Sequence, residues 1–265
     1  MANYIGTVND DFWRGSVDPD TANGGDGNDM LEGGDGADVL DGGAGNDFLF
    51  SYLDTSSLWP NPYFYKMSGD FGLEHDTVLG GSGDDKLVVG WGDTADGGAG
   101  NNELWISFFS ATSGVVADFR IVAAGGSITI NGGTISNISQ VISVDGSNFD
   151  DTIYTIGALT YAGIIRGEGG NDHIVGSEIT KYLFGGDGND WLDASTAVYG
   201  EVVSGDDGDD TIFTNPDDPY VHALGDFGND TIYAGGYALG GAGNDTIHIL
   251  RGRLDGTQRG IGYGG

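Results

Sequence analysis

Carboxylates that recur beside glycine-rich turns are the residues of this chain best suited to chemistry. Residues 24–50 read GGDGNDMLE, GGDGADVLD and GGAGNDFLF, three nine-residue units of the form G-G-x-G-x-D-x-U-x in which U is large and apolar. Asp29, Asp38 and Asp47 occupy the sixth position. The glycines allow turns with positive φ that aim carbonyl oxygens inward, and Ca²⁺ takes oxygen ligands. The spacing therefore predicts calcium-binding turns.

The same arrangement recurs along the chain, so several calcium ions are expected. The predicted carboxylate ligands are Asp29, Asp38, Asp47, Asp76, Asp85, Asp93, Asp151, Asp172, Asp190, Asp210, Asp230 and Asp245. The predicted carbonyl ligands are those of Gly24, Gly33, Gly42, Gly80, Gly185 and Gly240. Asn102 offers a weaker, neutral amide at the sixth position, and Lys181 places an ammonium there, which can replace a cation but never bind one. We expect the Asn102 turn to be filled last or not at all.

Short strands must separate and position these turns. The eighth residues Leu31, Leu40 and Leu49 begin such strands, and only alternate residues of a strand face inward, so one apolar residue per unit suffices for a thin core. Residues 6–23 keep the spacing with Asp11 and Asp20 but lack most of the glycines. This stretch is either a capping coil with weak or absent ion binding or a surface with solvated carboxylates.

The spacing changes in the second half of the chain. Successive sixth-position aspartates from Asp151 to Asp245 are 21, 18, 20, 20 and 15 residues apart, which are whole coils of a solenoid. One edge therefore keeps the predicted calcium turns, whereas the opposite edge carries segments of variable sequence. These segments are residues 155–166, 176–184, 194–204, 214–224 and 234–239.

The nonapeptides resemble those of the RTX (repeats-in-toxin, haemolysin-type) family of calcium-binding repeat proteins. The resemblance implies an all-β fold, a right-handed parallel β-roll or β-helix solenoid with stacked calcium-binding turns. It also implies that each nonapeptide is half a coil, so that residues eighteen apart, such as Asp29 and Asp47, stack on one edge and share an ion.

We expect one continuous solenoid over residues 1–265. A first repeat block spans residues 6–105, and an insertion at 51–70 holds Tyr52, Trp59, Tyr63, Phe64 and Tyr65. This aromatic insertion could stack on sugar rings or cover the edge of a thin core. Residues 106–145 form calcium-free connector coils, with strands expected at 127–130 and 135–142. A second block spans 146–248, and 249–265 form a tail.

Composition supports this reading and limits the partners. The net charge is −32, from 41 acidic and 9 basic residues, and the chain has 52 glycines and no cysteine. Such a chain repels itself in a compact state unless cations neutralise it, and it lacks the clustered Lys and Arg that nucleic acid requires. We expect no nucleic-acid partner, no disulfide and no transmembrane segment, since no apolar run approaches ~20 residues.

The variable edge offers a catalytic alternative. Side chains one coil apart could converge there, and the candidates are Lys181, Tyr182, Glu201, Tyr220 and His222, with Tyr199 beside Glu201 and with Tyr161 and Arg166 one coil earlier. Such groups could act as a polysaccharide lyase, or Glu201 with Asp218 as a glycoside hydrolase. Loops of any solenoid collect these residue types, so a structural role is favoured.

Aromatic residues also recur on the outward strand positions. Position nine reads Tyr154, Val175, Asp193, Phe213, Tyr233 and His248, and position seven includes His173 and Trp191. An exposed row of rings could bind a glycan or another subunit.

Two functions from different classes remain open. The first is a secreted protein that folds on extracellular calcium and serves as a structural, surface or glycan-binding module, exported by the Gram-negative type I route that is typical of the family. The second is a polysaccharide-active enzyme with its site on the variable edge or the aromatic insertion. The oligomeric state is not predicted.

Overall fold

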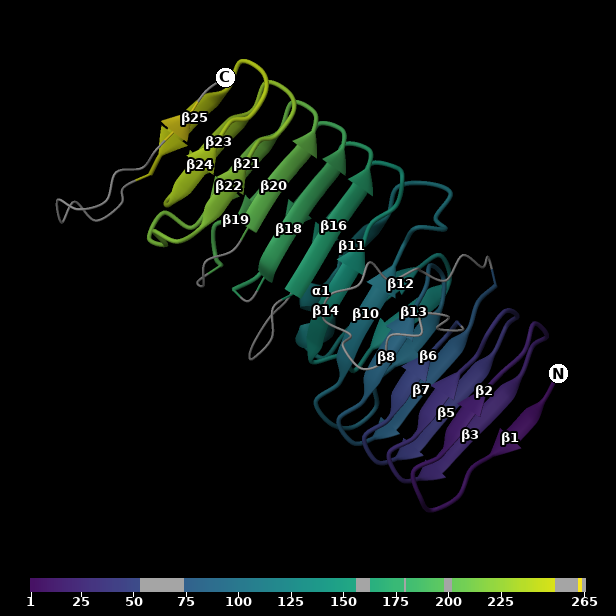
Figure 1. Ribbon diagram of the computed structural model, residues 1–265. Helices are drawn as coiled ribbons and strands as arrows, with labels where there is room; N and C mark the ends of the chain where they lie inside the picture. Colours follow the sequence, from purple (N-terminus) through teal and green to yellow (C-terminus); the bar gives the residue numbers. More distant parts are fainter. Residues whose placement is uncertain (53–73, 156–162, 179, 198–201, 251–261, 264–265) are drawn as a thin grey trace. The chain divides into compact units, whose positions relative to one another are not determined.

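The computed structural model describes residues 1–52, 74–155, 163–178, 180–197, 202–250 and 262–263. These residues form parallel strands stacked in long sheets, which confirms the predicted all-β, parallel β-roll class (Figure 1). The chain divides into two compact units. Unit 1 comprises Met1–Ser110 and Arg120–Asp145, and unit 2 comprises Ala111–Phe119 and Gly146–Gly265.

Unit 1 contains two layers of strands. One sheet has the order β1 (Asn3–Ile5), β3 (Thr21–Asp26), β5 (Val39–Ala44), β7 (Thr77–Ser82), β9 (Thr94–Asp96), β13 (Gly133–Ser136) and β12 (Ser127–Ile130). The other has the order β2 (Phe12–Arg14), β4 (Met30–Glu32), β6 (Phe48–Phe50), β8 (Lys86–Val89), β10 (Glu103–Ser107) and β14 (Gln140–Asp145). From β1 to β10 consecutive strands alternate between the layers, so each pair makes one coil. Met30, for example, pairs with Phe48, eighteen residues on.

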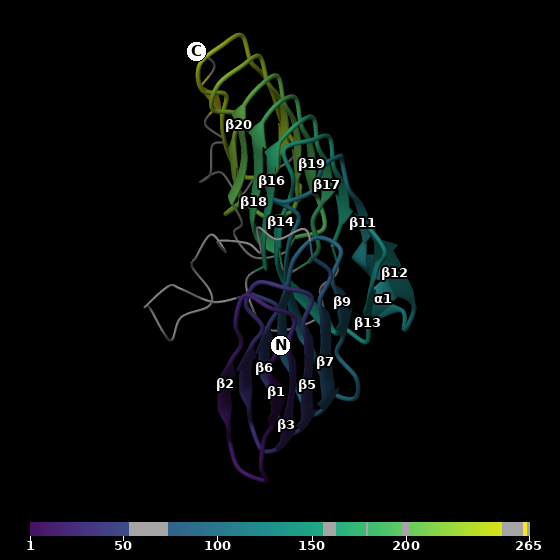
Figure 2. The same ribbon diagram turned by 90° about the vertical axis from the view of Figure 1, so that its right-hand side faces the viewer.

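Unit 2 repeats the two-layer arrangement (Figure 2). One sheet has the order β11 (Val116–Asp118), β15 (Thr152–Tyr154), β17 (His173–Val175), β19 (Trp191–Ala194), β21 (Thr211–Thr214), β23 (Thr231–Ala234) and β25 (Thr246–Ile249). The other has β16 (Gly163–Gly169), β18 (Thr180–Asp187), β20 (Val202–Asp207), β22 (His222–Leu224), β24 (Tyr237–Leu239) and β26 (Gly262–Tyr263). All described pairings in this unit are parallel.

A thin core lies between the two layers of each unit. The eighth-position residues Leu31, Leu40 and Leu49 are completely buried, as are Leu87 and Leu104. In unit 2 five of the equivalent residues are also completely buried, namely Ile153, Ile174, Leu192, Ile212 and Ile232, and Ile247 in the last coil is half-buried. Their neighbours in sequence point outward because side chains alternate along a strand. The period of nine places one core residue on each short strand.

The connector differs from its prediction in detail. The expected strand at 127–130 is β12, but the expected strand at 135–142 is divided between β13 and β14. Strand β12 pairs antiparallel with β13 through a turn at Asn131, whose φ is 48°. A short helix, α1 (Phe119–Ala123), was not predicted. Strand alternation in this stretch could not reveal the pairing direction, because an antiparallel strand has the same period.

Some predictions lie outside the described residues, including Trp59, Tyr63, Phe64 and Tyr65 of the aromatic insertion. Tyr52 is described and packs against a cluster of Phe50, Val88, Trp105 and Ile142. The single continuous solenoid stays a prediction. None of the helices in the described part of the chain is long and apolar enough to span a membrane.

Candidate metal-binding turns

The sixth-position aspartates lie in rows along the edges of the units. In unit 1 one row contains Asp11, Asp29, Asp47, Asp85 and Asn102, and the row on the opposite edge contains Asp20, Asp38, Asp76 and Asp93. In unit 2 a single row contains Asp151, Asp172, Asp190, Asp210, Asp230 and Asp245. Each aspartate directly precedes a strand, and the strand ladder sets its position in the row.

One carboxylate oxygen of each aspartate connects neighbouring coils. The backbone N–H of Asp29 donates to Oδ1 of Asp47 at 2.8 Å, and the N–H of Asp172 donates to Oδ1 of Asp190 at 2.7 Å. The same bond recurs along all three rows. This oxygen is therefore occupied in holding the stack together, and it faces the preceding coil.

The other carboxylate oxygen is buried and has no hydrogen-bond partner among the described residues. This holds for Oδ2 of Asp29, Asp38, Asp47, Asp85, Asp172, Asp190, Asp210, Asp230 and Asp245. A buried carboxylate oxygen without a partner is costly, because it has lost its hydration and gained nothing in return. This recurring set of buried carboxylate oxygens fits a cation bound at the same place in each of these nine turns.

Backbone carbonyls converge on the same places. A methyl group at Gly24 would lie 2.1 Å from Oδ2 of Asp29 and 2.6 Å from the carbonyl oxygen of Gly42, one coil on. At Gly185 the corresponding distances are 2.1 Å to Oδ2 of Asp190 and 2.6 Å to the carbonyl oxygen of Gly205. Each predicted carbonyl lies beside the first glycine of the preceding coil. Those of Gly42, Gly80, Gly185 and Gly240 converge there with an aspartate Oδ2, whereas those of Gly24 and Gly33 lie beside Gly6 and Gly15, in the turns of Asp11 and Asp20.

This donor set fits calcium. Its atoms are anionic carboxylate and neutral carbonyl oxygens, the hard ligands that Ca²⁺ prefers. The described residues contain no group of three or more His, Cys, Asp or Glu side chains that could hold a metal by themselves. A bound ion would therefore need backbone carbonyl oxygens as additional ligands. A side chain at the first glycine of the turn would fill the space on which these oxygens converge.

Burial shifts the titration of these carboxylates. It raises the pKa of Asp38, Asp47 and Asp190 to about 6, and neighbouring carboxylates contribute to the shift. For the same reasons the pKa of Asp210 is raised to about 7 and that of Asp172 to about 8. Without a cation Asp172 and, in part, Asp210 hold a proton at neutral pH, and the other three do so in mildly acidic solution, whereas a bound divalent ion would favour the ionised form.

Three predicted positions differ from the rest. At Asp93 the N–H of Gly90 donates to Oδ2 at 2.7 Å, and at Asp151 the N–H of Ser147 does so at 2.6 Å. At Asn102 the side-chain Nδ2 donates to the carbonyl of Asn137 at 3.1 Å. These turns satisfy their own polar atoms, so the sixth-position residue alone does not identify a site.

Sequence reasoning missed a second ladder at position five. The N–H of Asn46 donates to Oδ1 of Asn28 at 2.8 Å, and the N–H of Asn189 donates to Oδ1 of Asn171 at 2.8 Å. Here the later coil donates to the earlier one, the reverse of the position-six ladder. The signal was present, because Asn or Asp precedes the sixth-position residue throughout the row of Asp29 and the row of unit 2, although not in the row of Asp20, Asp38, Asp76 and Asp93.

The catalytic candidates that the structure describes are not gathered into one site. Lys181 and Tyr182 are neighbours on β18, with Nζ 5.9 Å from the centre of the tyrosine ring. His222 is two strands away from Tyr182 because Val202 pairs with both, a separation of roughly 10 Å. Tyr220 is exposed, and its N–H donates to Oδ1 of Asp218. Glu201, Tyr199 and Tyr161 lie outside the described residues.

The outward aromatic residues of unit 2 form one continuous row. This aromatic row consists of Tyr154, His173, Trp191, Phe213, Tyr233 and His248. The distance between neighbouring ring centres ranges from 4.3 Å, between His173 and Trp191, to 5.6 Å, between Tyr154 and His173. Phe213 and Tyr233 are stacked with 2° between their planes. Diagonal contacts join positions seven and nine, which the sequence analysis had treated as separate sets.

Comparison with known proteins agrees with this geometry. The RTX calcium-binding nonapeptide repeat family matches residues 14–49, 72–94, 161–178, 182–196, 199–218, 222–236 and 237–248, more than half of the chain. No curated protein matches the chain. The repeats, the parallel strands and the rows of carboxylates agree, and together they show that the chain belongs to the RTX family of calcium-binding nonapeptide-repeat proteins, with several Ca²⁺ ions as its cofactor.

Proposed function

We propose that this protein is a secreted module that folds when calcium fills its turns outside the cell, and that it serves there as a structural or surface element. The proposal depends mainly on one observation, the rows of buried Oδ2 atoms that have no hydrogen-bond partner among the described residues. Calcium binding follows from the family. Secretion, export and the role outside the cell are proposals.

Charge explains why folding would depend on calcium. The net charge of −32 opposes compaction, and the carboxylates in each row lie one coil apart. A ligand that binds only the folded state stabilises it by RT ln(1 + [L]/Kd), which reaches about 2.7 kcal/mol when the free ligand is a hundredfold above Kd. Several ions multiply this effect. At low cytosolic calcium the chain would stay extended, a form suited to one-step type I export from a Gram-negative cell.

A calcium titration of the full chain tests this proposal. The protein is dialysed against EGTA and titrated with Ca²⁺ while far-UV circular dichroism records β structure and light scattering records the hydrodynamic radius. We expect a cooperative gain of β structure and a smaller radius, with Mg²⁺ as the control that fails to produce them. A chain that is equally compact and equally heat-resistant in EGTA would contradict calcium-dependent folding.

Glycan binding is a second candidate, and the aromatic row supports it. The rings lie on the outward side of β15 to β25, and His248 at the end of the row is exposed. The acidic surface disfavours anionic polymers, so the expected ligand is a neutral polysaccharide. Affinity electrophoresis in gels containing neutral or acidic polysaccharides tests it. Retardation by a neutral polymer that Trp191→Ala abolishes is the expected result, and equal mobility in all gels would exclude this role.

A further inference from the structure

Leaving aside the turns of Asp76, Asp93 and Asn102, the rows contain two kinds of turn. In most turns Oδ2 of the aspartate has no partner among the described residues, and we call these the open turns. In three others, which we call the closed turns, the second residue carries a hydroxyl and binds the aspartate four residues later. The closed turns are Thr7 with Asp11, Ser16 with Asp20 and Ser147 with Asp151.

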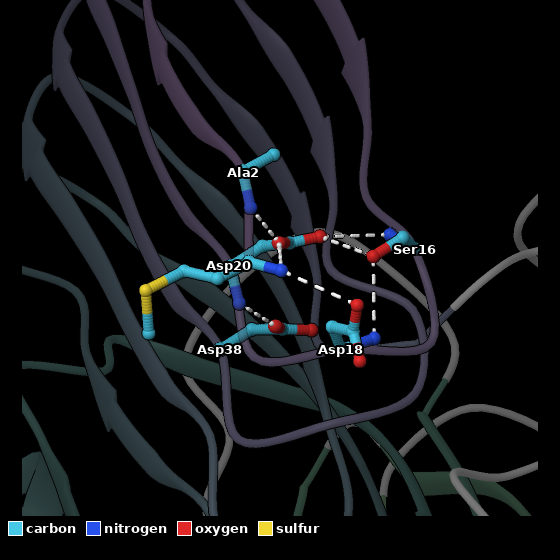
Figure 3. A network of polar contacts seen from close by, with 6 residues as sticks. Ala2, Ser16, Asp18, Asp20 and Asp38 are labelled. Carbon is cyan, nitrogen blue, oxygen red and sulfur yellow. Dashed lines mark hydrogen bonds and ion pairs between the residues drawn. The ribbon is translucent and has the colours of Figure 1, made fainter.

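The three closed turns share one hydrogen-bond pattern. In the Ser16 turn the backbone N–H and the hydroxyl both donate to Oδ2 of Asp20 at 2.9 Å, and the N–H of Asp18 donates to the hydroxyl at 3.2 Å (Figure 3). In the Ser147 turn the N–H donates to Oδ2 of Asp151 and the hydroxyl to Oδ1, and the N–H of Phe149 donates to the hydroxyl at 3.1 Å. The Thr7 turn repeats the pattern. The hydroxyl thus lies inside the turn.

The backbone separates the same two classes. In the open turns position two has positive φ, including 73° at Glu168, 69° at Asp206 and 68° at Asp226, where the residue is not glycine. Residues with a side chain adopt this conformation at a cost of roughly 1–2 kcal/mol. Thr7, Ser16 and Ser147 do not adopt it. Position four also differs, because open turns have glycines there, such as Gly188 with φ of 133°, whereas closed turns have Asn9, Asp18 and Phe149.

The closed turns also share a place in the structure, since each is the first turn of its row. In two of them a backbone N–H supplies the bond that a preceding aspartate would donate. The N–H of Ala2 donates to Oδ1 of Asp20 (Figure 3), and the N–H of Val115 donates to Oδ1 of Asp151 at 2.6 Å. Both oxygens of these two carboxylates are therefore occupied by donors from the chain itself.

We infer that the position-two hydroxyl and N–H take the place of calcium in the closed turns, so that Asp11, Asp20 and Asp151 bind no ion and each row begins with a calcium-independent turn. A cation at Asp151 would have to displace two protein donors that already satisfy the carboxylate, whereas at Asp190 it would gain an unpartnered oxygen. The inference rests on the proposed calcium filling of the open turns and assigns which turns are excluded from it.

Calcium stoichiometry of variants tests the inference, with ions per folded chain counted by equilibrium dialysis and atomic emission. Ser147→Gly with Phe149→Gly gives the turn the glycines of an open turn, and we expect one additional calcium per chain. Asp151→Asn should leave the number unchanged, whereas Asp190→Asn should lower it. The matched control is Ser82→Gly, because Ser82 lies at position three of an open turn and its hydroxyl contacts the carbonyl of Gly43.

Two results would overturn the inference: a calcium lost on Asp151→Asn, or a double glycine variant that folds and gains no calcium. If Asp151→Asn fails to fold, the double glycine variant decides. A wild-type chain that binds calcium but folds equally well in EGTA would overturn only the proposed function. In that case Ser147→Ala must still lower the midpoint of thermal unfolding while Ser82→Ala does not, and equal midpoints would overturn the inference.

Discussion

Each sixth-position aspartate in an open turn has one oxygen bonded within the stack and one without a hydrogen-bond partner among the described residues. We expect the second oxygen to bind the ion, and an amide can replace only the first. Asp190→Asn keeps an acceptor for the N–H of Asp172 but places a donor where Oδ2 converges with the carbonyl of Gly205. We expect the loss of at least one calcium and a stability lower by about 1–3 kcal/mol in calcium, measured by denaturant unfolding. Asp217→Asn removes the same charge from an exposed residue and should change neither quantity.

Asn102 is the natural example of that replacement. Its Oδ1 accepts the N–H of Asp85 at 2.9 Å and its Nδ2 donates to the carbonyl of Asn137. Asn102→Asp would set a carboxylate oxygen against that carbonyl, and at neutral pH or above a cation is needed to bridge the two. We expect the variant to be less heat-resistant than the wild type in EGTA and to bind one more calcium when the ion is added.

The outcome that contradicts this prediction is a variant with unchanged calcium stoichiometry and an unchanged midpoint in EGTA. Asn101→Asp is the matched control. It adds the same charge on the adjacent exposed residue, whose side chain contacts Asp84 rather than a carbonyl.

At the scale of elements, the aromatic row links the strands of one sheet independently of the turns. Phe213 lies between Trp191 at 5.3 Å and Tyr233 at 4.8 Å. Phe213→Ala should lower the free energy of unfolding by about 1 kcal/mol or more, because it removes two ring contacts and some apolar burial. Calcium stoichiometry should stay the same. Val175→Ala, on the same face but outside the row, should have a smaller effect on unfolding.

Sequence periodicity predicted the elements that follow the repeat and failed where the repeat stops. The nine-residue period placed Leu31 and Leu40 in the core, and the whole-coil spacing from Asp151 onward placed one row of turns in unit 2. Helix α1 and the β12–β13 hairpin lie where the glycine-aspartate pattern is absent. Their form depends on contacts between distant residues, such as the pairing of Ile135 with Ala95, which no local pattern encodes.

The candidate site was predictable to a similar extent. The sixth-position aspartates were identified by spacing, but the difference between Asp151 and Asp190 was not, because it depends on the residue at position two of each turn. Ser147 was visible in the sequence as a departure from glycine. Only the hydrogen bonds show that its hydroxyl satisfies the carboxylate.

At the scale of the whole molecule, the raised pKa values predict an opposite pH dependence with and without calcium. The ordinary pKa of an aspartate is 3.8, whereas the folded values reach about 8 at Asp172 and about 7 at Asp210. Between pH 3.8 and these folded pKa values, the ion-free fold therefore binds more protons than the unfolded chain does. The contribution of these carboxyls to the stability of the ion-free fold is fully present below pH 3.8 and is lost as the pH rises through their folded pKa values.

We therefore expect β structure in EGTA to increase as the pH falls from about 8 toward 5, as carboxyls such as Asp172 and Asp210 become protonated. With calcium present the apparent affinity should fall over the same range, because protons compete for the ionised ligands. Circular dichroism across a pH series in EGTA, with calcium titrations at each pH, measures both. β structure in EGTA that rises with pH would contradict the prediction.

The two side-chain ladders run in opposite directions, position six donating toward the later coil and position five toward the earlier one. Each coil of unit 2 from Asp151 to Asp245 thus presents the same donors and acceptors to both of its neighbours, whatever the length of its variable edge. Coils in unit 2 already range from 15 to 21 residues between aspartates. A gene that duplicates or deletes one whole coil would create a junction with unchanged bonding, so evolution can adjust the length of the protein without redesigning a turn.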